Sequence, residues 1–268
     1  MFISRALSPF YFVLLSFATA GLIGLSSCNQ PAQTDSPSET SQSTTIEPAD
    51  APLTAQDDVN YMTTLGLMKG HLMVAKELLD EDKPEEAEPH IGHPVEELYG
   101  DLEGQLAKRN VEQFKPTLNK LNDTVKSAPK APEVASQYEQ AMQKIDIAIA
   151  ALPEEQRRSP QFALPVINRI LNVAGEEYEA AIADGKFVEI IEYQDSRGFV
   201  LYAEELYQNI SSQMSEEHAE ASQAIEASLT ELKTAWPSVN PPETPLKTPE
   251  EVSGLVETIQ ENSQKVAS

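Results

Sequence analysis

Positive charge and cysteine are what this 268-residue chain has least of. It carries 19 lysines and arginines against 43 aspartates and glutamates, which gives a formal net charge of −24 at pH 7. Because nucleic acids and anionic lipid surfaces attract basic faces, this balance argues against both as partners. The single cysteine rules out an internal disulfide. With 40% hydrophobic and 23% charged residues, the composition is nevertheless that of a globular protein.

Signatures of common enzymes are also missing. The chain has no Gly-x-Ser-x-Gly nucleophile elbow, phosphate-binding loop, dinucleotide fingerprint or His-Glu-x-x-His pair. Acidic residues are so frequent that their spacing singles out no hydrolytic carboxylate pair. We therefore expect a protein without catalytic activity.

Residues 1–27 have the pattern of a secretory signal peptide. Arg5 precedes an apolar stretch from about Phe10 to Leu25, and no acidic residue occurs before Asp35. The apolar run is short for a membrane span. This segment is therefore set aside before the fold is considered.

The signal ends in Leu25-Ser26-Ser27-Cys28, which resembles the lipobox of bacterial lipoproteins. The resemblance implies that cleavage leaves Cys28 as the first residue, and that its sulfur carries lipid, with acyl chains such as palmitate anchoring the protein in the membrane. It also implies a place in the cell envelope, facing the periplasm. Asn29, where an aspartate would favour retention at the inner membrane, favours the outer membrane.

A polar segment follows the lipobox. Residues 28–57 are rich in Ser, Thr, Pro, Gln and acidic residues, and they show neither helical nor strand periodicity. This composition predicts a disordered tether that holds a domain away from the membrane.

The rest of the chain has helical periodicity. Apolar residues recur at spacings of three and four, as in Tyr61, Leu65, Met68 and Leu72, and alternating strand patterns are essentially absent. The fold class is therefore predicted to be all-α. Eight helices are expected, at about 58–81, 84–107, 112–128, 132–152, 161–184, 186–214, 216–235 and 249–265.

These eight helices look like four helices repeated once. Glu97-Leu98-Tyr99, for example, matches Glu205-Leu206-Tyr207 at an offset of 108 residues. The prediction is a tandem antiparallel helical bundle with a first repeat at 58–153 and a second at 154–268. The sequence leaves open whether the repeats form separate bundles or one fused bundle.

The main candidate site is a histidine-rich, acidic stretch in the first repeat. His71, His90 and His93 lie within 23 residues, and residues 76–103 hold eleven acidic residues against two lysines. Gly92 and Pro94 are expected to interrupt the second helix, with His93 as the N-cap of a helix that begins at Pro94. Glu96 is three residues after His93, so both side chains would share a helical face.

Imidazoles and carboxylates together suit Zn, Fe, Cu or Mn, so the predicted metal ligands are His71, His90, His93 and Glu96. The alternative is structural: such histidines also cap helices or form hydrogen bonds in a core. The fourth histidine, His218, stands among glutamates and is assigned to the surface.

The segment Gly92-His93-Pro94-Val95-Glu96, in a lipid-anchored helical protein with two repeats, resembles the imelysin-type proteins of bacterial envelopes. Those proteins have duplicated helical bundles, a Gly-x-His-x-x-Glu motif and a link to iron handling. This chain lacks the residue between glycine and histidine, so only His93 to Glu96 match. The resemblance implies that His93 and Glu96 belong to a metal site.

A second cluster lies in the other repeat, around Glu189, Glu192, Tyr193, Asp195 and Arg197. It is interpreted as a ligand or partner surface opposite the histidine stretch, with core aromatics and an Asp195–Arg197 turn contact as the alternative. The chain as a whole is predicted to be a binding lipoprotein of the envelope that holds a divalent or iron ion. The alternative function is a structural or assembly factor for an envelope protein complex.

Overall fold

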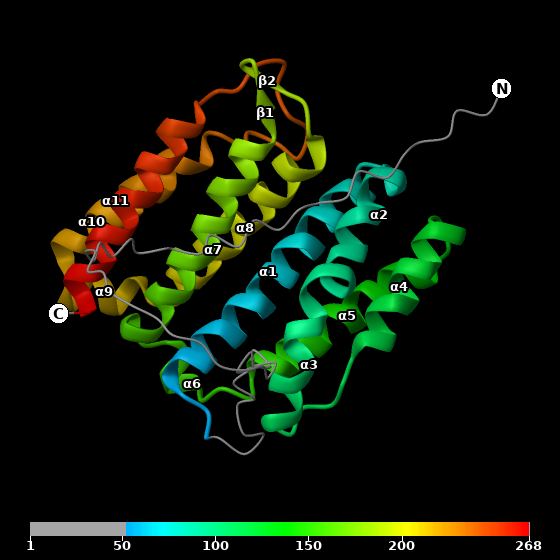
Figure 1. Ribbon diagram of the computed structural model, residues 1–268, viewed down its shortest axis with the longest axis horizontal. Helices are drawn as coiled ribbons and strands as arrows, with labels where there is room; N and C mark the ends of the chain where they lie inside the picture. Colours follow the sequence, from blue (N-terminus) through cyan, green and yellow to red (C-terminus); the bar gives the residue numbers. More distant parts are fainter. Residues whose placement is uncertain (1–51, 268) are drawn as a thin grey trace, which may run out of the picture. The chain divides into compact units, whose positions relative to one another are not determined.

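The computed structural model describes residues 52–267, so the predicted signal peptide, Cys28 and most of the tether lie outside the described residues. Helices dominate this part of the chain (Figure 1). They are α1 (Ala55–Asp80), α2 (Pro84–His93), the π-helix η1 (Pro94–Leu98), α3 (Tyr99–Lys108), α4 (Lys115–Ser127), α5 (Glu133–Ile149), α6 (Glu154–Arg157), α7 (Pro160–Ala180), α8 (Ile190–Gln208), α9 (Ser211–Glu217), α10 (Ala219–Lys233) and α11 (Pro249–Ala267).

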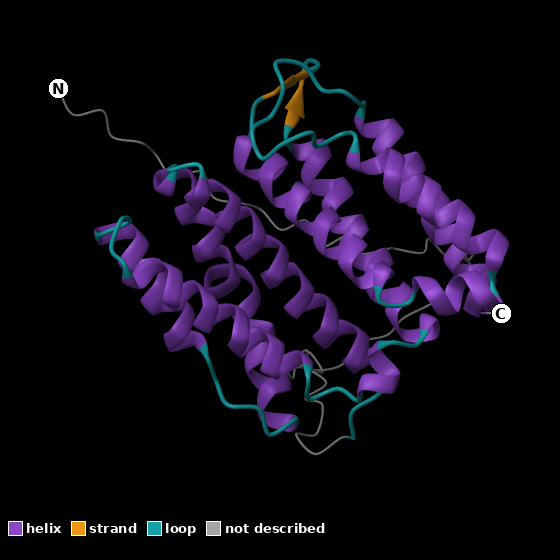
Figure 2. Cartoon of the chain, turned by 180° about the vertical axis from the view of Figure 1, so that it is seen from behind, coloured by secondary structure: helices purple, strands orange, loops and turns teal. Residues whose placement is uncertain are grey.

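The predicted all-α fold class is confirmed. Within residues 52–267 the strands are limited to β1 (Ile182–Ala183) and β2 (Lys186–Phe187), as Figure 2 shows. None of the helices described here combines the length and the apolar character that crossing a membrane requires.

Helix α1 is the centre of the packing. It begins with a capping box, in which the Thr54 side chain accepts a hydrogen bond from the Asp57 backbone and Asp57 accepts one from the Thr54 backbone. From Leu65 to Leu72 every residue of α1 is buried, so the helix has contacts on all sides. It packs against α2 and α5 of the first half and against α7 and α8 of the second half. The polar residues of α1 in this range, such as His71, are therefore surrounded by side chains of other helices.

Four longer helices make up each half of the chain. The first half contains α1, α2, α4 and α5, and the second contains α7, α8, α10 and α11 (Figure 1). Because α1 lies against α7 and α8, the described residues 52–267 belong to one compact unit. The division into repeats at 58–153 and 154–268 stays a prediction.

A short hairpin replaces the start of the helix that was expected over 186–214. Asp184 and Gly185 have φ values of 50° and 69°, and β1 pairs with β2 on either side of them. Positive φ at both central residues defines a type I′ turn, for which Asp-Gly is a preferred sequence. The Asp-Gly pair was therefore a hairpin signal that the helical periodicity around it masked.

The expected break at Gly92 and Pro94 takes a different form. His93 directly precedes an element that begins at Pro94, as predicted, but it has helical dihedrals (φ −50°, ψ −43°) and its side chain makes no capping hydrogen bond. The helix is therefore not broken and capped at His93. The helix instead widens into η1 between α2 and α3. A proline ring clashes with the carbonyl one turn earlier in a regular α-helix, and a widened turn relieves this clash. Such π-helical turns occur often at functional sites.

Helices α1 and α8 cross at two glycines. A Cβ atom on Gly70 would lie 2.6 Å from Phe199 Cδ1, and a Cβ on Gly198 would collide with the carbonyl oxygen of Gly70. Glycine at both positions therefore allows the two backbones to approach closely. The residues next to this crossing carry the side chains of the candidate site.

Candidate metal centre

Three histidines of the first half surround one carboxylate of the second half. We call His71, His90, His93 and Asp195 the His/Asp cluster. His71 lies on α1, His90 and His93 lie in the last turn of α2, and Asp195 lies on α8. The Nδ1 atoms of His71 and His90 lie 2.5 Å and 2.7 Å from Asp195 Oδ1, and Nδ1 of His93 lies 3.1 Å from Oδ2. All three imidazoles thus direct the same ring atom at one side chain.

The His/Asp cluster lies in the interior and opens to solvent on one side. The side chains of His90, His71 and Asp195 are 0%, 4% and 4% exposed, whereas that of His93 is 17% exposed. His71 is further enclosed by the ring of Phe199, whose centroid lies 4.8 Å from its own. His93 is therefore the member through which solvent reaches the cluster.

His93 and Asp195 shift each other's pKa values. Burial opposes ionisation of Asp195, but the charge of His71 and hydrogen bonds with all three histidines hold the pKa of Asp195 well below the usual range. Burial would likewise lower the pKa of His93, but the hydrogen bond and charge of Asp195, together with Glu97 and Glu192, raise it to about 9. The cluster therefore stabilises positive charge next to Asp195.

His90 is held at both ring nitrogens. Its Nε2 atom lies 2.9 Å from Gln194 Oε1, while Nδ1 faces Asp195. Gln194 is 1% exposed, and its own Nε2 atom lies 3.4 Å from Glu86 Oε2. The order of contacts is thus Glu86, Gln194, His90, Asp195.

Three more carboxylates lie around the solvent-facing side. Glu97 Oε1 is 3.9 Å from His93 Nε2. Burial, and then repulsion from Glu192, Asp195 and Glu97, raises the pKa of Glu177 to about 8. Burial and the charge of Asp195 also raise the pKa of Glu192. These carboxylates repel one another, and a cation placed near His93 would stabilise their charged forms.

The donor set fits a transition-metal ion. The four ligand atoms of the His/Asp cluster lie within 4.8 Å of one another. In a four-coordinate site with bonds of about 2.1 Å the ligand atoms are about 3.4 Å apart, so modest side-chain rotations bring these atoms into range. Three imidazole nitrogens and one carboxylate oxygen suit Fe, Zn or Cu better than Ca or Mg. Each Nδ1 atom faces a carboxylate oxygen, and the lone pairs of the two atoms would repel each other. A proton or a metal ion must therefore lie between the nitrogen and the oxygen.

Of the four predicted metal ligands, the structure brings together His71, His90 and His93 and leaves Glu96 outside. Glu96 is exposed and lies beside Gly92, away from the cluster. The expected pairing of His93 with Glu96 assumed α-helical spacing of three residues. In the structure Glu97, four residues after His93 and within the wider turn of η1, lies near the imidazole instead.

The five residues predicted as a partner surface are not on one surface. Glu189 is exposed at the start of α8, and Glu192 lies beside the solvent-facing side of the cluster. Tyr193 is buried, with its hydroxyl donating to the Ser238 carbonyl. Asp195 points into the cluster, and Arg197 forms an ion pair with Glu77. The turn contact between Asp195 and Arg197 does not form either, because both belong to α8.

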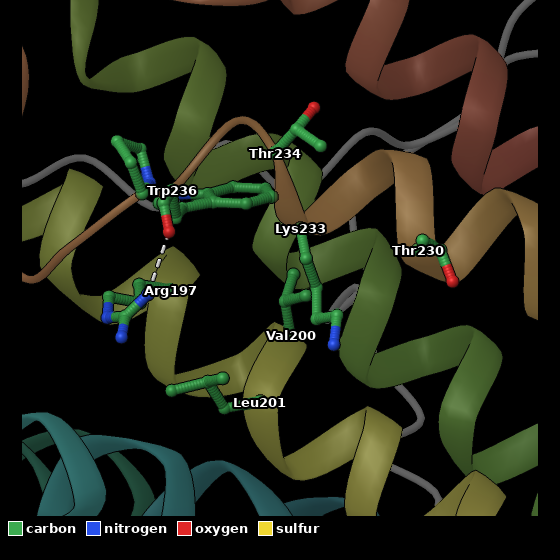
Figure 3. Close-up of a pocket in the computed structure, with 8 residues that line it drawn as sticks. Arg197, Val200, Leu201, Thr230, Lys233, Thr234 and Trp236 are labelled. Atoms are coloured by element: carbon green, nitrogen blue, oxygen red, sulfur yellow. Dashed lines mark hydrogen bonds between the residues drawn. The ribbon is translucent and has the colours of Figure 1, made fainter.

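One surface pocket on residues 52–267 lies away from the cluster (Figure 3). It has a volume of about 290 Å³ and lies between α8 and α10 next to Trp236. Its cationic groups have partners already, since Arg197 also donates to the Trp236 carbonyl and Lys233 pairs with Glu204. The pocket includes no member of the His/Asp cluster.

Asp195 and Gln194 are the functional candidates that the histidine pattern did not indicate. Asp195 had been assigned to a separate surface, and Gln194 had been given no role. The predicted duplication offers one signal, because it aligns Tyr193 and Ser196 with His90 and His93. If the repeats face each other, Gln194 and Asp195 fall opposite the histidines. The fourth histidine, His218, is half-buried between α9 and α10 and takes no part in the cluster.

Comparison with known families concerns the second half of the chain. Residues 153–268 match the family model of the iron permease-associated 4-helix bundle domain. This part of the chain is similar to that family, and it contains α7, α8, α10 and α11. No curated protein and no solved structure matches the chain. The matched range includes Asp195 and Gln194, whereas the three histidines precede it.

Proposed function

We propose that this protein is a non-catalytic metal-binding protein of the cell envelope, and that it holds a transition-metal ion, with iron as the first candidate, in the His/Asp cluster. The observation that carries the proposal is the convergence of three Nδ1 atoms on the buried carboxylate of Asp195. The similarity of residues 153–268 to the iron permease-associated domain supports iron as the ion.

A bound metal ion would compensate the negative charges in and around the cluster. In the absence of a metal ion, the raised pKa of His93 keeps a proton beside Asp195 at neutral pH. A divalent ion replaces this proton and supplies more charge to the same carboxylate, and it also relieves the repulsion among Glu97, Glu177 and Glu192. The histidines and Asp195 would hold the ion directly, while the outer carboxylates would attract it from solvent.

Two further parts of the proposal concern location and partner. The lipobox resemblance at Cys28 supports a lipid anchor and a position facing the periplasm. The family match supports a membrane iron permease as the protein partner, to which the ion would be passed. The acidic helical domain, held off the membrane by the predicted tether that precedes α1, would then act as an ion carrier beside the permease.

Metal analysis of the purified full-length chain tests the function. We expect close to one bound ion per chain after loading with Fe²⁺, Zn²⁺ or Cu²⁺, and loss of that ion in a variant that combines H71A, H90A and H93A. Equal metal content in this variant and in the unaltered chain would refute the proposal. Replacement of His218 by alanine serves as the matched control, because His218 lies outside the cluster.

A further inference from the structure

We propose that Gln194 is a positioning residue of the metal centre, which holds His90 so that Nδ1, and not Nε2, is presented to the ion. The inference rests on the proposed function, because it concerns the same centre. It adds a role for two residues, Gln194 and Glu86, that the metal-ligand set does not contain.

The argument starts from two consecutive residues of α8. Asp195 contacts Nδ1 of His90 at 2.7 Å, and Gln194 contacts Nε2 of the same ring at 2.9 Å. Consecutive helical side chains diverge by about 100°, so the two side chains reach the ring from different directions. His90 is completely buried, and both of its ring nitrogens contact side chains of α8.

The orientation of the Gln194 amide follows from its other neighbour. Its Nε2 atom lies 3.4 Å from Glu86 Oε2, which can only accept when ionised. If the amide were turned over, its oxygen would face the Glu86 carboxylate and its NH₂ group would face His90. Repulsion between the two oxygens disfavours that arrangement. The amide oxygen must therefore face His90, and Nε2 of His90 must carry a hydrogen.

The tautomer of His90 is fixed by this contact. With the Nε2 hydrogen donated to Gln194, a neutral imidazole has its lone pair on Nδ1, the atom that faces Asp195 and the other two histidines. Metal-bound histidines commonly donate their second N–H to such an acceptor. Loss of the acceptor typically weakens metal binding by about 10- to 100-fold. Gln194 thus orients a ligand without contacting the ion.

The test compares three variants with the unaltered chain. Q194M keeps the length of the side chain and removes the acceptor. The double variant E86Q/Q194E exchanges the two side chains, so that a carboxylate accepts from His90, an amide donates to that carboxylate, and the net charge is unchanged. Q137M is the matched control, because Gln137 is a buried glutamine of α5, is 6% exposed and lies outside the cluster.

Co²⁺ is the probe, since its visible absorption reports the number and arrangement of its ligands. Affinity is measured by competition with a chelator, and circular dichroism establishes that each variant is folded. We expect Q194M to bind Co²⁺ about 10- to 100-fold more weakly with an altered absorption spectrum. We expect E86Q/Q194E to retain the spectrum and an affinity within about threefold of the unaltered chain, and Q137M to match it.

Two results would overturn the inference. If Q194M binds with the affinity and spectrum of Q137M, Gln194 has no positioning role, although the proposed metal function stands. If E86Q/Q194E is folded but is as weak as Q194M, an acceptor at position 194 is not what matters. Failure of the unaltered chain to bind Co²⁺, Fe²⁺ or Zn²⁺ is a different outcome, because it removes the proposed function and the inference together.

Discussion

His71 Nδ1 lies 2.5 Å from Asp195 Oδ1, although 124 positions separate the two residues in the sequence. The contact joins α1 of the first half to α8 of the second, next to the crossing at Gly70 and Gly198. A buried carboxylate with several imidazole partners is costly to leave without them. The packing of the two halves and the chemistry of the cluster therefore depend on each other.

Replacing Asp195 by asparagine tests this dependence. The change removes the one negative charge that all three imidazoles face, together with one metal ligand. We expect metal affinity to fall by more than about 100-fold, and the free energy of unfolding of the metal-free protein to fall by about 3 kcal/mol. Chelator competition and urea denaturation measure the two effects. D123N, at an exposed position of α4, is the control and should change neither.

The raised pKa of Glu177 predicts how stability depends on pH. Its pKa rises from 4.5 to about 8 on folding, because burial and neighbouring carboxylates disfavour the charged form. The stability that the neutral form contributes is therefore complete below about pH 4.5 and is lost as the pH rises through 8. Urea denaturation at pH 5, 7 and 9 should show this loss in the metal-free protein.

The variant E177Q removes that titration. We expect a smaller loss of stability between pH 5 and pH 8 in E177Q than in the unaltered chain, while E176Q, at an exposed neighbouring position, should behave like the unaltered chain. His93 contributes in the same direction, since its pKa rises from 6.5 to about 9, and its share of stability is lost as the pH rises through 9. Parallel pH profiles for E177Q and the unaltered chain would contradict the assignment to Glu177.

Metal affinity should rise with pH. Below about pH 9 His93 holds a proton, and this proton competes with the ion for the cluster. For each proton that the ion displaces, apparent affinity should increase about tenfold per pH unit in this range. Competition titrations at pH 6, 7 and 8 measure the slope. An affinity that is independent of pH would show that the ion does not bind through these imidazoles.

The wide turn of η1 predicts a difference between two neighbouring glutamates. Glu97 is 3.9 Å from His93 Nε2, whereas Glu96 lies beside Gly92. E97Q should therefore lower the pKa of His93, because it removes a negative charge that stabilises the imidazolium, and E96Q should leave this pKa nearly unchanged. Titration of the His93 ring signals by NMR distinguishes the two variants. A larger shift for E96Q would restore the α-helical pairing of His93 with Glu96.

The glycine crossing can be tested by adding one methyl group. G198A places a Cβ against the Gly70 carbonyl, so α1 and α8 must separate. We expect a loss of stability of about 1–3 kcal/mol and weaker metal binding, because His71 and Asp195 are on the two separated helices. G104A is the matched control: nothing lies within 4 Å of the added atom, and alanine favours the helix by about 0.5–1 kcal/mol. If G198A has the same stability and metal affinity as G104A, the close approach of α1 and α8 is not needed for the site.

The sequence predicts the helices well wherever one face is steadily apolar. Leu65, Met68 and Leu72 recur at spacings of three and four, and all three are fully buried in α1. It fails where a local exception overrides that pattern. The Asp184-Gly185 turn forms a hairpin inside a helical context, and Pro94 widens a helix that was expected to break. Both exceptions depend on backbone dihedral angles, which a hydrophobic period does not report.

The candidate site was also predicted only in part from the sequence. Three histidines within 23 residues, on helices of the predicted period, were enough to indicate His71, His90 and His93. Glu96 was chosen by assuming regular helical spacing, and the wide turn places Glu97 near His93 instead. Asp195 and Gln194 lie more than 100 residues from His90, and no local pattern specifies which face of α8 meets α2.

The sequence by itself therefore determined the all-α class, the approximate extent of most helices, and the three histidines, since all of these follow from local spacing and residue chemistry. Only the tertiary structure decided that α1 crosses α8 at Gly70 and Gly198, and that Asp195 and Gln194 reach the histidines through this packing. The physical reason is that helix contacts between the two halves depend on how apolar faces and small residues fit together in three dimensions. A carboxylate acquires its partners, its pKa and its chemistry only when that fit is made.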